Sequence, residues 1–145
     1  VNAGAQMVQL QISYRPGQLE AFMAACVANG VTERAIVLPS VCLTKGAKGL
    51  GFMNDKVPGI SVPAESIDRV ANADNQAEEA YLLVRDLTAH ALALPGAAGI
   101  HITDFRHDGS LQRLTDELHI GPQFDTMSNR FDPTSEREEH HAHNS

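Results

Sequence analysis

The sequence predicts an α/β fold built around a small parallel sheet. Three short segments, 6–14, 35–43 and 99–105, have the composition of strands, and segments with helical periodicity separate them. No hairpin signal joins the strands, so each connection is expected to be a right-handed crossover between parallel strands. The middle segment, AIVLPSVCL, is almost entirely apolar, as expected of a strand that is buried on both faces.

The first predicted strand has two unlike faces. One face holds Met7, Gln9, Gln11 and Ser13, and the other holds Val8, Leu10 and Ile12. A buried amide without partners costs roughly 1–3 kcal/mol, so the two glutamines must contact water, other protein groups or a ligand. The pair Pro16-Gly17 is expected to end this strand as a turn.

The first predicted helix spans residues 18–28 and is amphipathic. Its apolar residues recur at the spacing of one helix face, and they are Leu19, Phe22, Met23, Cys26 and Val27. Asn29-Gly30 supplies a stop at its C-terminus. In the strand that follows, Pro39 is expected to end the regular part.

Four further helices are predicted. A short helix is expected at 46–54, then a loop with two prolines, and then a helix that begins near Pro63. A long helix spans 76–94 and ends at Pro95-Gly96. Its inner face comprises Ala77, Ala80, Tyr81, Val84, Leu87, Thr88, Ala91 and Leu94. The last helix, 110–118, has Ser110 as its expected N-cap.

Composition limits the classes of function. The chain has 145 residues, of which 43% are hydrophobic and 20% charged, as in a single soluble domain. A formal net charge of −7 disfavours nucleic-acid binding. No apolar run is long enough for a membrane span and no signal peptide is visible, so a cytoplasmic protein is expected. Cys26 and Cys42 are expected to be buried free thiols rather than a disulfide.

The predicted sheet is small and its first strand has no partner before it. This pattern is typical of the second part of a larger α/β domain. A (β/α)8 barrel of about 250 residues would need roughly as much chain again before Val1. The chain also enters a strand almost at once, which fits either a processed N-terminus or a piece of a longer protein.

Four segments, in order, resemble the methylenetetrahydrofolate reductase family of flavin-dependent (β/α)8 barrels. They are AGAQMVQLQISY, AIVLPSVCLTKGAKGLGFM, KVPGISVPAESIDRV and GAAGIHITDFR, and the resemblance covers about residues 3–118. Their order and spacing are more specific than any one of them. The resemblance implies that residues 1–120 form the C-terminal half of the barrel, about strands six to eight with their helices. The polar residues 121–145 are predicted to be a disordered or loosely docked tail.

The same resemblance implies an activity. The reaction would be reduction of 5,10-methylenetetrahydrofolate to 5-methyltetrahydrofolate in one-carbon and methionine metabolism, with hydride passing from a nicotinamide or other donor through FAD. In the family, the catalytic acid, the carboxylate that tunes the flavin and most FAD contacts precede the sixth strand. This chain is therefore expected to supply the folate-side wall, to lack the catalytic half and to be inactive alone, with no catalytic residue of its own. A homo-oligomer is left open.

Three residues are implied in folate binding by the resemblance. Gln11 aligns with the family's pterin-binding glutamine, and one amide can meet both donors and acceptors on a pterin edge. Ala47 stands where the family often has an aromatic ring that stacks on the folate. Phe105 either lines the folate pocket or belongs to the core. Gln9 is expected to be an interior amide and His101 a buried structural histidine.

Other polar residues have plainer interpretations. Lys48 is expected on a solvated helix face. Asp104, Arg106, His107 and Asp108 follow the last strand and are interpreted as a solvated loop. The histidines of the segment 139–143 are not expected to hold a physiological metal, because no supporting residues surround them.

Two other classes of function remain open. One is a binding or partner module, a half-barrel that assembles with another subunit or binds folate without reducing it. The other is a further barrel enzyme of one-carbon metabolism, such as a corrinoid-linked methyltransferase, which would share the folate contacts and need no flavin. The motifs of dinucleotide-binding folds, of serine hydrolases and of redox dithiols are absent from the sequence.

Overall fold

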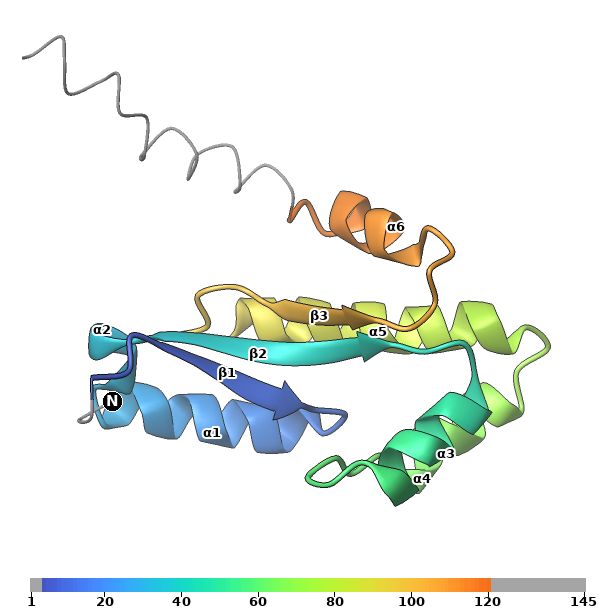
Figure 1. Cartoon of the computed structure of the whole chain (residues 1–145), viewed down its shortest axis with the longest axis horizontal. Helices are drawn as coiled ribbons and strands as arrows, with labels where there is room; N and C mark the ends of the chain where they lie inside the picture. Colours follow the sequence, from blue (N-terminus) through green and yellow to red (C-terminus); the bar gives the residue numbers. More distant parts are fainter. Residues whose placement is uncertain (1–3, 121–145) are drawn as a thin grey trace, which may run out of the picture. The chain divides into compact units, whose positions relative to one another are not determined.

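A computed structural model describes residues 4–120 of the chain. Two compact units are present, one ending at Leu111 and the other beginning at Gln112. The elements are β1 (Met7–Ile12), α1 (Pro16–Ala28), α2 (Val31–Arg34), β2 (Ile36–Leu43), α3 (Ala47–Lys56), α4 (Ala64–Ala71), α5 (Gln76–Ala93), β3 (His101–Asp104) and α6 (Ser110–Glu117) (Figure 1). The predicted tail at 121–145 and the histidine segment within it lie outside the described residues.

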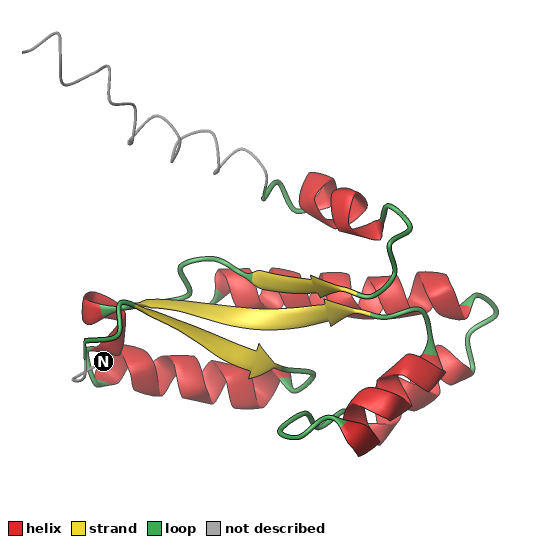
Figure 2. Cartoon of the chain, in the orientation of Figure 1, coloured by secondary structure: helices red, strands yellow, loops and turns green. Residues whose placement is uncertain are grey.

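The strands form one parallel sheet in the order β1-β2-β3 (Figure 2). The pairing of β1 with β2 begins at Met7 and Ile36. The pairing of β2 with β3 runs from Ser40 and His101 to Leu43 and Asp104. Parallel strands joined by helices confirm the α/β prediction and are consistent with part of a (β/α)8 barrel.

Helices α1 and α5 cover one face of the sheet. Val37 of β2 packs there against Leu19 and Met23 of α1 and Ala91 of α5, and Val8 and Leu10 of β1 join the same cluster. Because side chains alternate along a strand, Met7, Gln9 and Gln11 point the other way and are exposed. We call the surface formed by Met7, Gln9, Gln11 and Ile36 the open face of the sheet.

A second apolar cluster joins the sheet to α3, α4 and α5. It comprises Tyr14, Cys42, Leu50, Met53, Ile60, Val62, Val70, Ala80 and Leu83. The Tyr14 hydroxyl donates to the Cys42 carbonyl oxygen at 3.3 Å, which satisfies a polar group that burial would otherwise penalise. Burial raises the pKa of the Cys42 thiol to about 11, so the thiol stays protonated at neutral pH. This cluster holds α3 beside the carboxyl end of β2.

Pro16 and Pro39 both behave differently from their prediction. Pro16 does not form a turn but opens α1, because the first turn of a helix needs no N–H from it. Pro39 does not end β2 but lies inside it, fully buried. Since proline has no N–H to donate, it accounts for the shift in register by which Gln9 pairs with Leu38 but Ile12 pairs with Ser40.

Helix details also differ from the sequence prediction. In α1, Phe22 and Val27 are exposed and the buried residues are Leu19, Met23 and Cys26. Helix α2 was not predicted, since four residues show no periodicity. Ser110 is the first residue of α6, and the carboxylate of Asp108 accepts its N–H at 3.1 Å. None of the helices between residues 4 and 120 combines the length and the hydropathy that a membrane span needs.

Candidate functional site

The carboxyl ends of β2 and β3 adjoin a cavity of about 530 Å³. Ligands of parallel α/β folds bind at this end of the strands. We call it the strand-end cavity, and it is lined by Thr44, Lys45, Gly46, Lys48, Gly49, Phe52, Met53, Gln76 and Phe105. Its walls therefore come from the segment after β2, the first turns of α3, the start of α5 and the first residue after β3.

Two glycines shape the start of α3. Gly46 is its N-cap, and a Cβ there would lie 3.0 Å from Oε1 of Gln76. That same oxygen accepts the N–H of Ala47 at 3.2 Å. A Cβ on Gly49 would lie 3.3 Å from Cβ of Thr44. The glycines thus let the Gln76 and Thr44 side chains approach the helix start closely.

Two aromatic side chains stand exposed at the cavity. Phe52 of α3 is 60% exposed and Phe105 is 57% exposed. The N–H of Phe105 donates to the carbonyl oxygen of Leu43 at 3.1 Å, which continues the sheet pairing and fixes the residue at the strand end. Large exposed apolar side chains that line a cavity are typical of a ligand-binding surface.

The cations near this cavity differ in their surroundings. Lys45 and Lys48 line it and are exposed, and neither has an ion pair or side-chain hydrogen bond among residues 4–120. Arg106 is buried, and its Nη1 donates to the carbonyl oxygens of Thr44 at 3.2 Å and Ala77 at 2.6 Å. Its Nε lies 3.1 Å from the carboxylate of Asp108. The interpretation of this loop as fully solvated is therefore wrong for Arg106, which fastens the loop to its neighbours.

The loop after β3 is tightly bonded within itself. Oδ1 of Asp104 accepts the N–H of Arg106 at 2.9 Å and that of His107 at 3.2 Å. His107 adopts a φ of 52°, which is uncommon for residues other than glycine. Hydrogen bonds from Ser110, together with the Arg106 guanidinium, hold the pKa of Asp108 at about 2. This network sets the position from which Phe105 reaches the cavity.

The residues predicted to bind folate lie in different places. Phe105 lines the strand-end cavity. Ala47 is in the first turn of α3 but packs against the apolar cluster beneath it. Gln11 lies beside the turn after α3, where its Nε2 donates to the carbonyl oxygen of Pro58 at 3.2 Å and its Oε1 accepts the N–H of Ile12 at 2.9 Å. Gln11 is not among the residues that line the cavity.

Of the nine residues that line the cavity, sequence reasoning singled out only Lys48 and Phe105. Phe52, Lys45 and Gln76 are among the residues that it missed. Lys45 and Phe52 lie in the segment TKGAKGLGF, which does carry a recognisable signal. A run of glycines and lysines directly after a buried strand is a usable signal, because such a run starts a helix at the functional edge of a parallel sheet. Gln76 carries no comparable signal, since it lies at the start of a distant helix.

His101 joins the three strands on the open side of the sheet. Its Nδ1 lies 3.4 Å from Nε2 of Gln9 and 3.3 Å from Oγ of Ser40. Because an amide nitrogen can only donate, we assign Nδ1 as the acceptor and place the ring proton on Nε2. The half-buried ring thus ties one residue of each strand together, as a structural histidine does.

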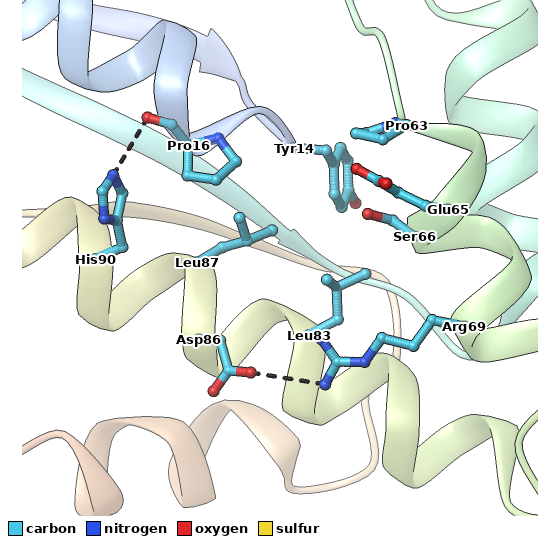
Figure 3. Close-up of a pocket in the computed structure, with 10 residues that line it drawn as sticks. All are labelled: Tyr14, Pro16, Pro63, Glu65, Ser66, Arg69, Leu83, Asp86, Leu87 and His90. Carbon is cyan, nitrogen blue, oxygen red and sulfur yellow. Dashed lines mark hydrogen bonds and ion pairs between the residues drawn. The ribbon is translucent and has the colours of Figure 1, made fainter.

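A second cavity lies on the helix side of the molecule. It measures about 310 Å³ and is lined by Tyr14, Pro16, Pro63, Glu65, Ser66, Arg69, Leu83, Asp86, Leu87 and His90 (Figure 3). Arg69 contacts Glu79 at 2.6 Å and Asp86 at 3.6 Å, and Nε2 of His90 lies 3.2 Å from the carbonyl oxygen of Pro16. Since its Arg and His already have partners, this cavity is the weaker candidate. Within the described chain, no group of three His, Cys, Asp or Glu residues is placed to hold a metal.

A sequence model of the methylenetetrahydrofolate reductase family matches residues 1–118. The matched range is well over half of the 145 residues and contains every element from β1 to α6. It confirms the family that the four quoted segments resemble. No curated protein matches the chain.

Proposed function

The chain belongs to the methylenetetrahydrofolate reductase family, and on this premise we propose that it is the folate-binding wall of a reductase that converts 5,10-methylenetetrahydrofolate to 5-methyltetrahydrofolate. Family membership by itself implies an oxidoreductase of folate metabolism. We propose two things beyond family membership. One is the particular reaction, and the other is that the three strands are the sixth to eighth of a barrel.

The observation that carries this proposal is the strand-end cavity with its two exposed phenylalanines. A folate contains a flat pterin and a flat aminobenzoyl ring. Phe52 and Phe105 line the cavity and are both more than half exposed. Aromatic side chains so placed can stack on flat rings, and such contacts contribute about 0.5–1.5 kcal/mol each beyond the burial of apolar area. In this arrangement Phe52 takes the stacking role that Ala47 cannot fill.

Gln11 is proposed to contact the pterin. Its amide uses one Nε2 hydrogen on Pro58 and one Oε1 lone pair on Ile12. One further hydrogen and one further lone pair remain, and these can meet an acceptor and a donor on the pterin edge. Gln11 also lies next to the end of β1, the end at which barrel enzymes bind their substrates.

The catalytic acid is proposed to lie outside residues 4–120. Opening the ring of the substrate requires a group that can donate a proton. The two carboxylates of the loop after β3 are poorly suited to this, because Asp104 accepts two backbone N–H groups and the pKa of Asp108 is held at about 2. Neither lines the strand-end cavity. The chain therefore positions substrate rather than transferring a proton to it.

FAD supplies the hydride in this family when it is bound, but the open face does not by itself fit this cofactor. A dinucleotide needs cations or helix N-termini for its pyrophosphate. The strands MVQLQI, IVLPSVCL and HITD contain no Lys or Arg. We therefore assign no residue of the open face to FAD and propose that its contacts come from chain N-terminal to β1.

Titration calorimetry with 5-methyltetrahydrofolate tests the binding proposal. The chain is expected to bind the folate, and Phe105→Ala is expected to weaken binding by about three- to tenfold through loss of one stacking contact. Phe22→Ala is the matched control, because Phe22 is 50% exposed on α1 and does not line the cavity. Absence of binding, or equal weakening by both variants, would refute the proposal.

The coding sequence upstream of Val1 tests whether the chain belongs to a larger reductase. An in-frame extension of roughly 150 residues with alternating strand and helix patterns would complete a barrel, and the complete polypeptide should show flavin absorbance and reductase activity. A start codon directly before Val1 would instead favour a half-barrel that works with a partner subunit. The exposed Met7 and Ile36 of the open face are the feature that such a partner would cover.

A further inference from the structure

The cavity of about 310 Å³ between α4, α5 and the segment after β1 has apolar walls. We call it the helix-side cavity. Tyr14 and Leu83 are buried in its walls, and Leu87 of α5 is half-buried beside them. It shares no lining residue with the strand-end cavity. Ligand pockets measure about 300–1,000 Å³ and combine apolar walls with a few polar groups, so this cavity suits a small ligand.

Several hydrogen-bond donors of the helix-side cavity are already engaged. Nε of Arg69 donates to the carboxylate of Glu79 at 2.6 Å. Nε2 of His90 lies 3.2 Å from the carbonyl oxygen of Pro16, and it must donate there because a carbonyl oxygen can only accept. The hydroxyl of Tyr14 donates to a backbone carbonyl oxygen at 3.3 Å. These three donors are therefore unavailable to a ligand.

The hydrogen-bond acceptors of the same cavity are free. The Glu65 carboxylate and the Ser66 hydroxyl have no side-chain partner among residues 4–120, and both point toward the ring of Tyr14 (Figure 3). The Asp86 carboxylate lies 3.6 and 3.9 Å from two guanidinium groups. Both distances are longer than a hydrogen bond, so its oxygens can still accept. A ligand of this cavity therefore has to be a donor.

The charges around the helix-side cavity favour a cation. Arg69 contacts Glu79 at 2.6 Å and Asp86 at 3.6 Å, and Arg85 contacts Asp86 at 3.9 Å. These two cations face three carboxylates once Glu65 is included, so one negative charge remains unmatched. Opposite charges attract most strongly where apolar walls lower the local dielectric. An anionic ligand would be repelled here, and a neutral one would leave Glu65 without a counter-charge.

We propose that the helix-side cavity binds a primary ammonium group carried on an apolar chain. The ammonium donates to Glu65 and Ser66, and the chain lies against the leucines of α5 and the ring of Tyr14. A free alkylamine and the lysine side chain of another polypeptide offer the same chemistry. The site stands or falls independently of folate binding, because the two cavities have no residue in common.

An NMR titration of the ¹⁵N-labelled chain with pentylammonium tests this inference, since such spectra report weak binding and its location. Pentylammonium is expected to bind about fivefold more tightly than the neutral pentanol, as one exposed ion pair allows, and pentanoate should bind most weakly. The advantage over pentanol should shrink as salt is added. Each methylene removed from the amine should weaken binding about twofold, because less apolar surface is buried.

Glu65→Gln is expected to remove the advantage of pentylammonium and to leave pentanol binding unchanged. Asp68→Asn is the matched control, because Asp68 is an exposed carboxylate on the same helix and does not line the cavity. The spectrum of each variant also shows whether it is folded. Equal binding of pentylammonium and pentanol, or an equal loss in both variants, would overturn the proposal.

Two further probes distinguish the sources of the ammonium. The first is a lysine blocked by an acetyl group and a methylamide, and the second is cadaverine, a free diamine with the same five-carbon chain. If the blocked lysine binds as tightly as pentylammonium, the cavity accepts the lysine of another polypeptide. If only cadaverine and pentylammonium bind, the ligand is a free amine. If none of the three shifts the signals of the lining residues, the ammonium site is wrong and the folate proposal is untouched.

Discussion

At the residue scale, Gly96 occupies a position whose surroundings leave no room for a side chain. It lies between α5 and β3 with a φ of +86°, and a Cβ there would lie 2.8 Å from the Cγ2 atoms of both Thr32 and Val27. Thr32 belongs to α2 and Val27 to α1. The glycine is therefore needed both for its backbone conformation and for the close approach of these helices.

Gly96→Ala is expected to destabilise the chain by about 1–3 kcal/mol, because the substitution adds strain at positive φ and overpacks the contact. Urea denaturation measures this change in the free energy of unfolding. Gly51→Ala is the control, since nothing lies within 4 Å of a Cβ at this helical position, and a gain of up to about 1 kcal/mol is expected there. Equal effects of the two variants would contradict the account.

The polar residues also show what sequence can predict at this scale. Gln9 was expected to be an interior amide paired with its neighbours or water. It does pair with a neighbour, His101 of another strand, but it is exposed and not interior. The role of Arg106 was not predictable, because its acceptor on Thr44 lies 62 positions away in the chain. Phe52 was not singled out, since its exposure depends on how α3 lies against the cluster below it.

At the element scale, the loop after β3 depends on one carboxylate. Asp108 accepts the N–H of Ser110, the first residue of α6, and pairs with Arg106. These interactions lower the pKa of Asp108 from 3.8 to about 2. A lowered pKa means that the ionised carboxylate stabilises the folded state above pH 3.8 and that this contribution is lost as the pH falls toward 2.

Asp108→Asn is therefore expected to be less stable than the wild type at neutral pH and to lose less stability between pH 4 and pH 2. Thermal melts across this range measure the difference. Asp74→Asn is the control, because Asp74 is exposed between α4 and α5. Parallel pH profiles for wild type and Asp108→Asn would show that the carboxylate does not stabilise this loop.

At the scale of the whole molecule, the sheet is covered by helices on one face and open on the other. Met7 is 56% exposed and Ile36 is 49% exposed, and the two are paired across β1 and β2. Exposed apolar groups on a sheet with free edges favour association with another surface. In a closed barrel, the open face would lie in the interior.

The chain is accordingly expected to bind a hydrophobic dye and to self-associate as its concentration rises. The double variant Met7→Thr/Ile36→Thr should reduce both effects without loss of stability, since threonine suits strands. Dye fluorescence and sedimentation velocity provide the measurements. Phe22→Thr on α1 is the control, and a reduction of the same size in that variant would argue against a role of the open face.

The sequence by itself determined the class of fold, the family and the order of the strands and helices apart from α2, because periodicity, turn residues and ordered motifs are local properties. Only the tertiary structure decided which groups form the site. It placed Phe52, Lys45 and Lys48 at one cavity with Phe105, seated Gln11 at a turn and buried Arg106. These outcomes depend on how segments far apart in the chain pack together, and local patterns carry no information on that packing.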